Sequence, residues 1–193
     1  MNTSLKRIAE SAMLIAIGTV LSVVTAFQGP WALGGSITVC SMLPLVMIAH
    51  RYGTAWGVLS AFVYSVLQFV LGMNSVQYAP DFKSAAAIVV LDYILAYTVI
   101  GFSACFNGKV ADRRKSIILG IVVTFLARLL CHFISGVLIW EVLFPNELGW
   151  APPIWSIAYN GSFMVPEIII TSLAAYFSYK PLERYWTGAD IVR

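Results

Sequence analysis

Residues 116–143 read SIILGIVVTFLARLLCHFISGVLIWEVL, and this stretch decides the class of the protein. Apart from Arg128, His132 and Glu141, it contains only apolar and small uncharged side chains. A transmembrane helix needs about 20 consecutive, mostly apolar residues, and this run exceeds that length. The stretch therefore predicts a helix that crosses a lipid bilayer.

The whole chain has the same character. Of its 193 residues, 60% are hydrophobic and 11% are charged, and its mean hydropathy is +0.84. A water-soluble domain has about 25% charged residues. The composition excludes an ordinary soluble enzyme, a disordered chain and a basic nucleic-acid-binding protein, and it predicts an integral membrane protein surrounded by the lipid bilayer.

Further apolar stretches, separated by short polar or Pro/Gly breaks, predict six helices in all. Their expected bounds are Leu5 to Phe27, Thr38 to Ala49, Thr54 to Gly72, Ser84 to Phe106, Ser116 to Leu143 and Pro153 to Tyr179. Six spans of about 20 residues use most of the chain. We therefore expect residues 1–193 to form one all-α membrane domain, a bundle of six transmembrane helices.

Lys and Arg indicate on which side of the membrane the loops lie, because cytoplasmic loops are enriched in them. With six spans, ten of the twelve Lys and Arg residues fall on the side of the two termini, Lys83 falls on the other side, and Arg128 lies within a span. This distribution predicts that both termini are inside the cell. The loops 28–37, 73–83 and 144–152 are then expected to face outward.

Four ionisable side chains lie within predicted spans: Asp92, Arg128, His132 and Glu167. Such groups are costly in a membrane, so they usually face a partner, a cavity or a substrate route. We favour a structural ion pair between Arg128 and Glu167, which lie at similar depth. Asp92 then either pairs with Arg128 or, in the interpretation we favour, receives a cationic or hydrogen-bond-donating ligand. Glu141, near the end of its span, is interpreted as reaching the membrane interface.

Two helix faces combine polar and aromatic groups. His132 and Trp140 lie on nearly the same face of one helix, and Trp155 and Tyr159, four residues apart, form one wall of another. For His132, ligand contact and hydrogen bonding inside the bundle are equally open. Asn160 either binds adjacent donor and acceptor atoms of a ligand or holds two helices together.

With Trp31 and Tyr93 added, these residues predict a pocket that opens outward. Aromatic faces attract weakly hydrated cations by about 0.5–2 kcal/mol each, so indoles and phenols around one acid, Asp92, favour a flat, cationic small molecule. No metal site is expected, because the other histidine, His50, lies on the opposite side of the membrane. No catalytic or phosphate-binding motif is present either, and the sequence favours a binding protein over an enzyme.

Several short motifs occur in an order that resembles a known family. They are Trp31-x2-Gly34-Gly35-Ser36, the pair Asp92-Tyr93, His132 followed by Trp140, and Tyr159-Asn160-Gly161-Ser162-x3-Pro166-Glu167. Over essentially its whole length, the chain resembles the thiamine-specific substrate-binding subunits (the ThiT or YuaJ family) of energy-coupling-factor transporters.

The resemblance implies a six-helix fold whose outward-facing site is closed by the loop after the first helix. It implies that Trp31 and Trp140 sandwich the rings of thiamine. It also assigns binding roles to Asp92, Tyr93, His132 and Asn160. The family commonly has Glu where this chain has Asp92 and Tyr where it has Trp155. These departures bear on how tightly thiamine is bound and on how well it is distinguished from similar ligands.

The resemblance further implies partners: a transmembrane coupling subunit and two ATP-hydrolysing subunits in a bacterial cell membrane. The first helix of such proteins docks on the coupling subunit through small residues, here Ala12 and Ala16, which allow two helices to approach closely in lipid. ATP is used by the partners, and no cofactor is expected in this chain. The predicted function is the thiamine-binding membrane subunit of an ATP-driven vitamin importer.

Three alternatives to this function stay open from the sequence, one of them a purely structural assembly subunit that binds no small molecule. The chain could be a sister subunit for another vitamin or a thiamine precursor. It could also belong to a different class, an intramembrane enzyme that uses Asp92 and His132 as an acid–base pair.

Overall fold

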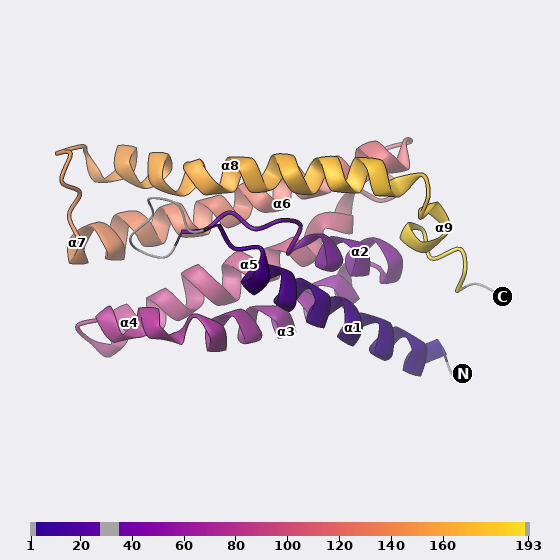
Figure 1. The fold of residues 1–193 in the computed structure, drawn as a ribbon, viewed down its shortest axis with the longest axis horizontal. Coiled ribbons are helices and arrows are strands. Elements are labelled where there is room, and N and C mark those ends of the chain that lie inside the picture. The colour runs from indigo at the N-terminus through magenta and orange to yellow at the C-terminus, as the bar shows by residue number, and fades with distance from the viewer. Residues whose placement is uncertain (1–2, 28–34, 192–193) are drawn as a thin grey trace.

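The computed structural model describes residues 3–27 and 35–191, and within these ranges it contains helices and no β-strand (Figure 1). In chain order the helical elements are α1 (Thr3–Val24), α2 (Leu43–Tyr52), α3 (Thr54–Leu71), η1 (Met73–Tyr78), α4 (Phe82–Ile88), η2 (Val89–Leu95), α5 (Ala96–Thr98), η3 (Val99–Phe106), α6 (Arg113–Ser135), η4 (Gly136–Trp140), α7 (Glu141–Leu143), α8 (Pro152–Tyr179) and α9 (Glu183–Trp186).

Five helices of the described chain are long and apolar enough to cross a membrane. They are α1, α3, the run from α4 to η3, the run from α6 to α7, and α8. The structure thus confirms an all-helical protein with several candidate membrane spans. Their bounds differ from the predicted ones by a few residues at most.

The second predicted helix is the exception. It was expected over Thr38 to Ala49, but α2 begins only at Leu43, and its ten residues extend about 15 Å, half of a hydrocarbon core of about 30 Å. The backbone N–H and hydroxyl of Thr38 both donate to Glu167 on α8, at 2.9 and 2.6 Å. These bonds anchor Thr38 in the non-helical segment 35–42, and α2 begins only where Pro44 lies in its first turn, the part of a helix in which proline is tolerated.

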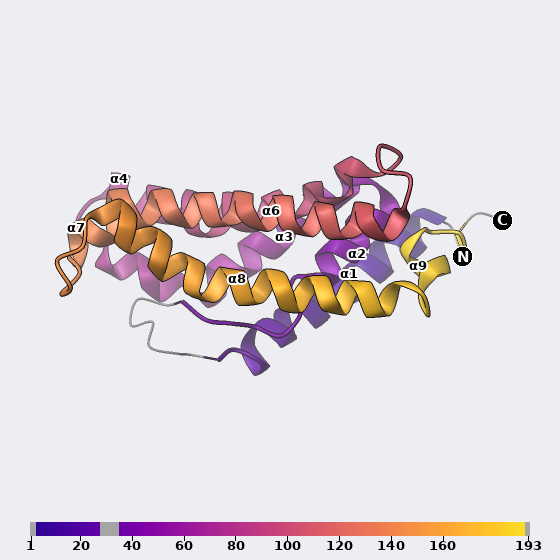
Figure 2. The ribbon, with the colours of Figure 1, turned by 90° about the horizontal axis from the view of Figure 1, so that it is seen from above.

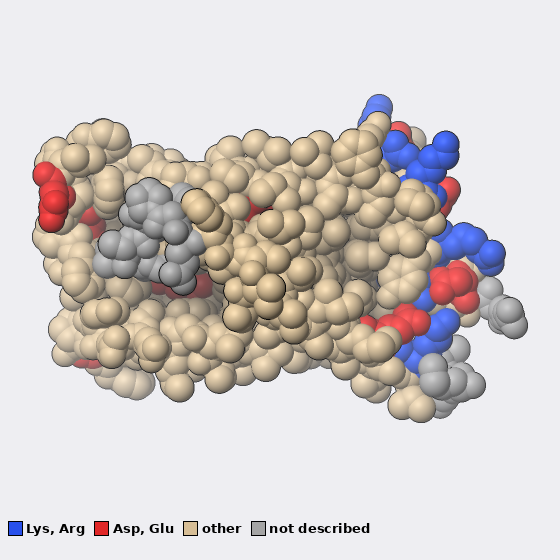
Figure 3. Space-filling view, in the orientation of Figure 1, with Lys and Arg blue, Asp and Glu red and all other residues tan. Residues whose placement is uncertain are grey.

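The elements form an elongated bundle with two different ends (Figures 1 and 2). The start of α1, α2 and α9 lie at one end, while α4, α7 and the start of α8 lie at the other. In the face drawn in Figure 3, the blue Lys and Arg side chains gather at the first end, and none is visible at the second. We refer to these as the basic end and the far end.

Arg51 fastens the elements of the basic end. Its side chain is fully buried and donates hydrogen bonds to Glu10 of α1, to both carboxylate oxygens of Asp190 and to the backbone oxygen of Tyr185. The bonds from Arg51 lower the pKa of Asp190 to about 2. One guanidinium therefore joins α1, α2, α9 and the segment after α9.

Small residues allow the helices of the core to touch backbone to backbone. A Cβ atom added at Gly101 in η3 would lie against the backbone of Val58 in α3 and 2.6 Å from the carbonyl carbon of Gly57. A Cβ at Gly120 in α6 would collide with the carbonyl oxygen of Ser103 in η3. Lipid gives helices little hydrophobic reason to associate, so close packing at such positions stabilises the bundle.

We predict that Gly101→Ala lowers the thermal stability of the detergent-purified protein by about 1–3 kcal/mol, the usual cost of overpacking, because its methyl group meets backbone that cannot rotate away. Gly161→Ala in α8 is the matched control, since a Cβ there meets nothing within 4 Å and it should leave stability unchanged or slightly raised. The melting temperatures of the two variants check this, and equal values would contradict the close crossing.

Candidate functional site

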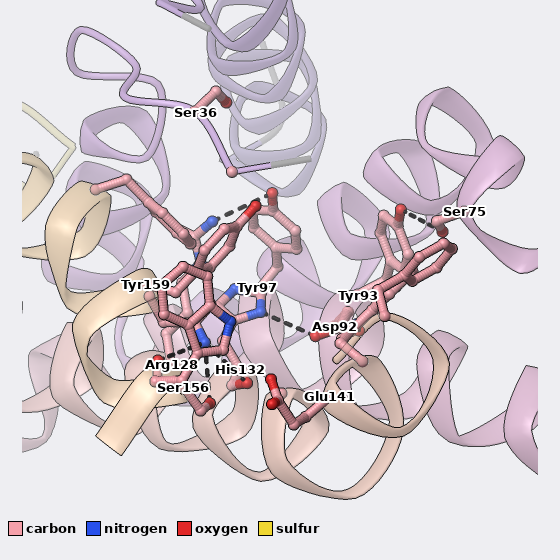
Figure 4. Close-up of a pocket in the computed structure, with 17 residues that line it drawn as sticks. Ser36, Ser75, Asp92, Tyr93, Tyr97, Arg128, His132, Glu141, Ser156 and Tyr159 are labelled. Carbon is pink, nitrogen blue, oxygen red and sulfur yellow. Dashed lines mark hydrogen bonds and ion pairs between the residues drawn. The ribbon is translucent and has the colours of Figure 1, made fainter. Parts of the chain in front are cut away.

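A cavity of about 180 Å³ lies among η2, α5, the run from α6 to α7, and α8, in the half of the molecule away from the basic end (Figures 1 and 4). Seven residues predicted for the site line it: Asp92, Tyr93, His132, Trp140, Trp155, Tyr159 and Asn160. The eighth, Trp31, lies outside the described residues. Gly35 and Ser36, which follow its segment, line the cavity.

Asp92 is held by three donors from a single helical run. His132 Nδ1 lies 3.0 Å from one carboxylate oxygen, while Ser135 Oγ donates to the other at 2.6 Å and Trp140 Nε1 donates to it at 2.9 Å. A carboxylate has about four acceptor positions, so Asp92 retains capacity for a ligand. The alternative Asp92–Arg128 pair is not formed in the structure. Asp92 is therefore positioned by an imidazole, a hydroxyl and an indole, none of which needs to carry a positive charge to make its hydrogen bond.

Two π-helical stretches position these groups. η2 (Val89–Leu95) contains Asp92, and η4 (Gly136–Trp140) ends at Trp140. Single π turns inside α-helices are frequent at functional sites, because the extra residue rotates every side chain that follows. Trp140 was expected on nearly the same face as His132, but at about 100° per residue a regular helix would leave it some 80° away. The extra residue of the π turn reduces this angular offset by about 100°, which brings Trp140 onto the helix face of His132.

The deep end of the cavity is closed by the predicted ion pair. Arg128 Nη1 lies 2.8 Å from Glu167 Oε2, and both side chains are buried, which confirms the pairing expected from the sequence. Arg128 also donates to Met42 Sδ at 2.9 Å and to the Tyr97 hydroxyl at 3.3 Å. The other oxygen of Glu167 accepts the two bonds from Thr38. The pair therefore connects α6, α8, α5 and the segment before α2.

Aromatic side chains form two walls. On α8, Trp155 and Tyr159 lie 5.8 Å apart between ring centroids, and Phe163 continues the row at 6.1 Å. From the run of η4 and α7, Trp140 stacks on Phe144, which follows α7, at 6.3 Å between ring centroids with an interplanar angle of 20°. Such surfaces suit a flat ring.

Tyr78 of η1 meets the second wall edge-on, 6.4 Å from Trp140 between ring centroids. Tyr93 contributes its ring to the cavity, while its hydroxyl donates to the backbone oxygen of Gly72 at 2.8 Å. The phenol of Tyr93 is thus held by the end of α3 rather than turned to a ligand.

The amide of Asn160 takes the packing role that the sequence left open. Its nitrogen donates to the backbone oxygen of Ser156 at 2.9 Å and to that of His132 at 3.3 Å. A Cβ at Gly136 would strike the Ser156 hydroxyl, so α6 and α8 cross closely here. The nitrogen is thus committed to the crossing, and the amide oxygen is what Asn160 can offer to a ligand.

The structure adds lining residues that the sequence analysis did not select. Tyr97, Ser156 and Glu141 line the cavity, and Ser135 bonds Asp92. Ser135 lies three residues after His132, a helical spacing that could have indicated it. Glu141 could not be found in this way, because only the π turn brings it toward the His132 side.

The family model described as "Thiamine transporter protein (Thia_YuaJ)" matches residues 8–185. The chain belongs to this thiamine transporter family. The chain is similar to the thiamine transporter ThiT of Bacillus subtilis (strain 168), to which it is 28% identical over 180 residues, or 88% of each chain.

Two solved structures resemble the fold of this family member. ThiT from Listeria monocytogenes has a TM-score of 0.75 and 25% sequence identity, and the match covers 96% of this chain and 99% of that one. The S component of a bacterial ECF transporter has a TM-score of 0.62 and 20% identity, covers 94% of this chain and 98% of that one, and shows a shared fold.

Membership of the thiamine transporter family confirms the predicted class of the chain. It is a transport protein of a bacterial cell membrane with several membrane-crossing helices, and it is not an enzyme. The alternative of an intramembrane enzyme is therefore set aside. Among the described residues no group of three or more His, Cys, Asp or Glu side chains could hold a metal ion.

We predict that Arg128→Met destabilises the protein without ligand by about 3–5 kcal/mol, because it leaves the negative charge of Glu167 buried without a positive partner. The double variant Arg128→Met/Glu167→Gln should recover much of this loss, since it removes the charge while the Gln oxygen still accepts from Thr38. Thermal unfolding in detergent checks both variants. A double variant no more stable than the single one would argue against a stabilising pair.

Proposed function

We propose that this chain is the substrate-binding membrane subunit of an energy-coupling-factor importer, and that it binds thiamine from the outer side of the membrane. The observation that carries the proposal is the Asp92 carboxylate, held ready by three donors inside an aromatic-lined cavity. Thiamine combines a flat aminopyrimidine with a cationic thiazolium, which are the two features that such a site recognises.

The orientation we propose puts the basic end inside the cell and the far end outside. Lys and Arg are enriched on the cytoplasmic side of membrane proteins, and the far end carries the cavity. We further propose that residues 35–52, an extended segment followed by α2, serve as the sixth crossing of the bilayer. Non-helical backbone at this depth is tolerated because Glu167 and other protein groups satisfy it. Both termini are then inside, and residues 1–193 act as one membrane domain.

Within the site, we assign the rings of thiamine to the space between the aromatic walls, with Trp140 on one side and Trp155 and Tyr159 on the other. Asp92 accepts a hydrogen bond from the ligand or balances its positive charge. His132 Nε2, which is buried and accepts or donates no hydrogen bond within the described residues, completes the polar surface together with the Asn160 oxygen.

Further assignments concern Trp31 and Tyr93. The ends of the segment that contains Trp31 are joined by two backbone bonds between Phe27 and Ile37, at 2.8 and 3.2 Å. Because Gly35 and Ser36 line the cavity, we place Trp31 as a cover over the bound rings. Tyr93 supports the site through its ring.

The cavity volume of about 180 Å³ is below the roughly 300–1,000 Å³ typical of ligand pockets. Thiamine binding therefore requires lining side chains to move apart. The Trp140–Asp92 hydrogen bond is the contact that we expect to open, because it lies between the stacking surface and the acid.

The partners we propose are a transmembrane coupling subunit and two ATPase subunits, which use the ATP, so that this chain holds no cofactor. Ala12 and Ala16 are both exposed on α1, as a docking surface for the coupling subunit requires. A sister role for another vitamin or a thiamine precursor is the remaining alternative, and a titration with several ligands distinguishes it.

We predict that Asp92→Asn weakens thiamine binding by about 10–100-fold, the effect of losing one charged hydrogen-bond acceptor. Quenching of tryptophan fluorescence on titration of the purified protein measures the affinity. Glu147→Gln, in an exposed acid of the outer loop, is the matched control and should bind like the parent chain. If riboflavin binds more tightly than thiamine, the proposed function is wrong; if Asp92→Asn binds thiamine like the parent chain, Asp92 is not part of the site.

A further inference from the structure

Glu141 has two carboxylate oxygens in different surroundings. Oε1 accepts hydrogen bonds from the backbone N–H of Asn146, at 3.0 Å, and from its side-chain amide. Oε2 is buried and has no hydrogen-bond partner in the described part of the chain. A buried charged oxygen without a partner is costly, and in native proteins such an atom calls for a functional explanation.

The position of Glu141 supplies that explanation. Glu141 lines the same cavity as Asp92, and in Figure 4 its carboxylate projects from its helix into the space that Asp92 and His132 also face. In a regular helix Glu141, nine residues after His132, would point to the opposite side, at about 180°. The π turn of η4 returns it to within about a quarter turn of His132.

Acidic side chains outnumber basic ones around the cavity. Arg128 contributes a positive charge, but Glu167 neutralises it at 2.8 Å. Asp92 and Glu141 then remain as two acids, and neither faces a Lys or Arg among the described ion pairs. In surroundings of low dielectric constant, uncompensated acids favour a cation and disfavour an anion strongly.

We propose that Glu141 is a second ligand-contacting acid of this cavity, and that its free oxygen gives the site its preference for a cationic ring over a neutral one. Trp140 and Glu141 both line the cavity, so a cationic ring stacked on that indole shares the cavity with the Glu141 carboxylate. This inference rests on the proposed function and deepens it. It divides the work between Asp92, which is bonded within the bundle, and Glu141, whose second oxygen is left for the ligand.

A purely structural role is the competing explanation. Through Oε1, Glu141 fixes Asn146, whose side chain in turn bonds both the N–H and the carbonyl of Trp150. Glu141 could therefore do no more than shape the loop between α7 and α8. Asn146→Ala removes the side-chain bonds of this loop contact, to Glu141 and to Trp150, while it keeps the acid and the backbone N–H of residue 146, which makes it the matched control.

The experiment titrates the purified chain and three variants with two probes, thiamine and the neutral 4-amino-5-hydroxymethyl-2-methylpyrimidine that forms half of it. Glu141→Gln should weaken thiamine binding about tenfold and change pyrimidine binding by less than about threefold. Glu141→Asp keeps the charge and should keep the ratio of the two affinities. Asn146→Ala should likewise keep that ratio, even if it lowers both affinities.

Three results would overturn the proposal: an unchanged thiamine affinity in Glu141→Gln, an equal loss for both probes, or the same loss of preference in Asn146→Ala. If Glu141→Gln does not fold, the ratio in Glu141→Asp decides, because a ratio that falls with the charge retained also contradicts the inference. Failure of the parent chain to bind thiamine at all is a different result, which refutes the proposed function itself.

Discussion

The ion pair of Arg128 and Glu167 is the interaction on which the other features depend, because in a bilayer neither charge can be solvated by water. Its partners come from four parts of the chain: α6, α8, α5 and, through Thr38, the segment before α2. The two hydrogen bonds from Thr38 anchor the non-helical residues 35–42, which precede α2, to α8. The pair closes the deep end of the cavity and leaves the space above it to a ligand.

Above this pair, the site is built from helices that depart locally from regular geometry. A membrane protein cannot expose irregular loops to lipid. A π turn redirects a side chain while the backbone hydrogen bonds stay within the helix. η2 and η4 are such turns, and they bring Asp92 and Trp140 into hydrogen-bonding contact. Each helix remains continuous through the membrane while its inner face is adapted for binding.

Much of the fold and several residues of the site could be predicted from the sequence by physical arguments. Apolar length indicated the five long helices, and the cost of charge in lipid indicated the Arg128–Glu167 pair. The same argument placed Asp92 in the cavity. The later start of α2 has a local signal in Pro44, which is tolerated in the first turn of a helix but not in its interior, whereas the bonds from Thr38 to a residue far along the chain could not be predicted. Glu141 was assigned to the interface because it lies near the end of its span, and no local pattern reveals the π turn that brings it toward the His132 side.

The central claim is that thiamine occupies the cavity beside Asp92 and Trp140. An experimental structure of the purified chain with bound thiamine tests it most directly. The account predicts a thiamine ring stacked on Trp140, a ligand polar atom within hydrogen-bonding distance of the Asp92 carboxylate, and an opened Trp140–Asp92 contact. Thiamine bound elsewhere, with all three hydrogen bonds to Asp92 intact, would contradict it.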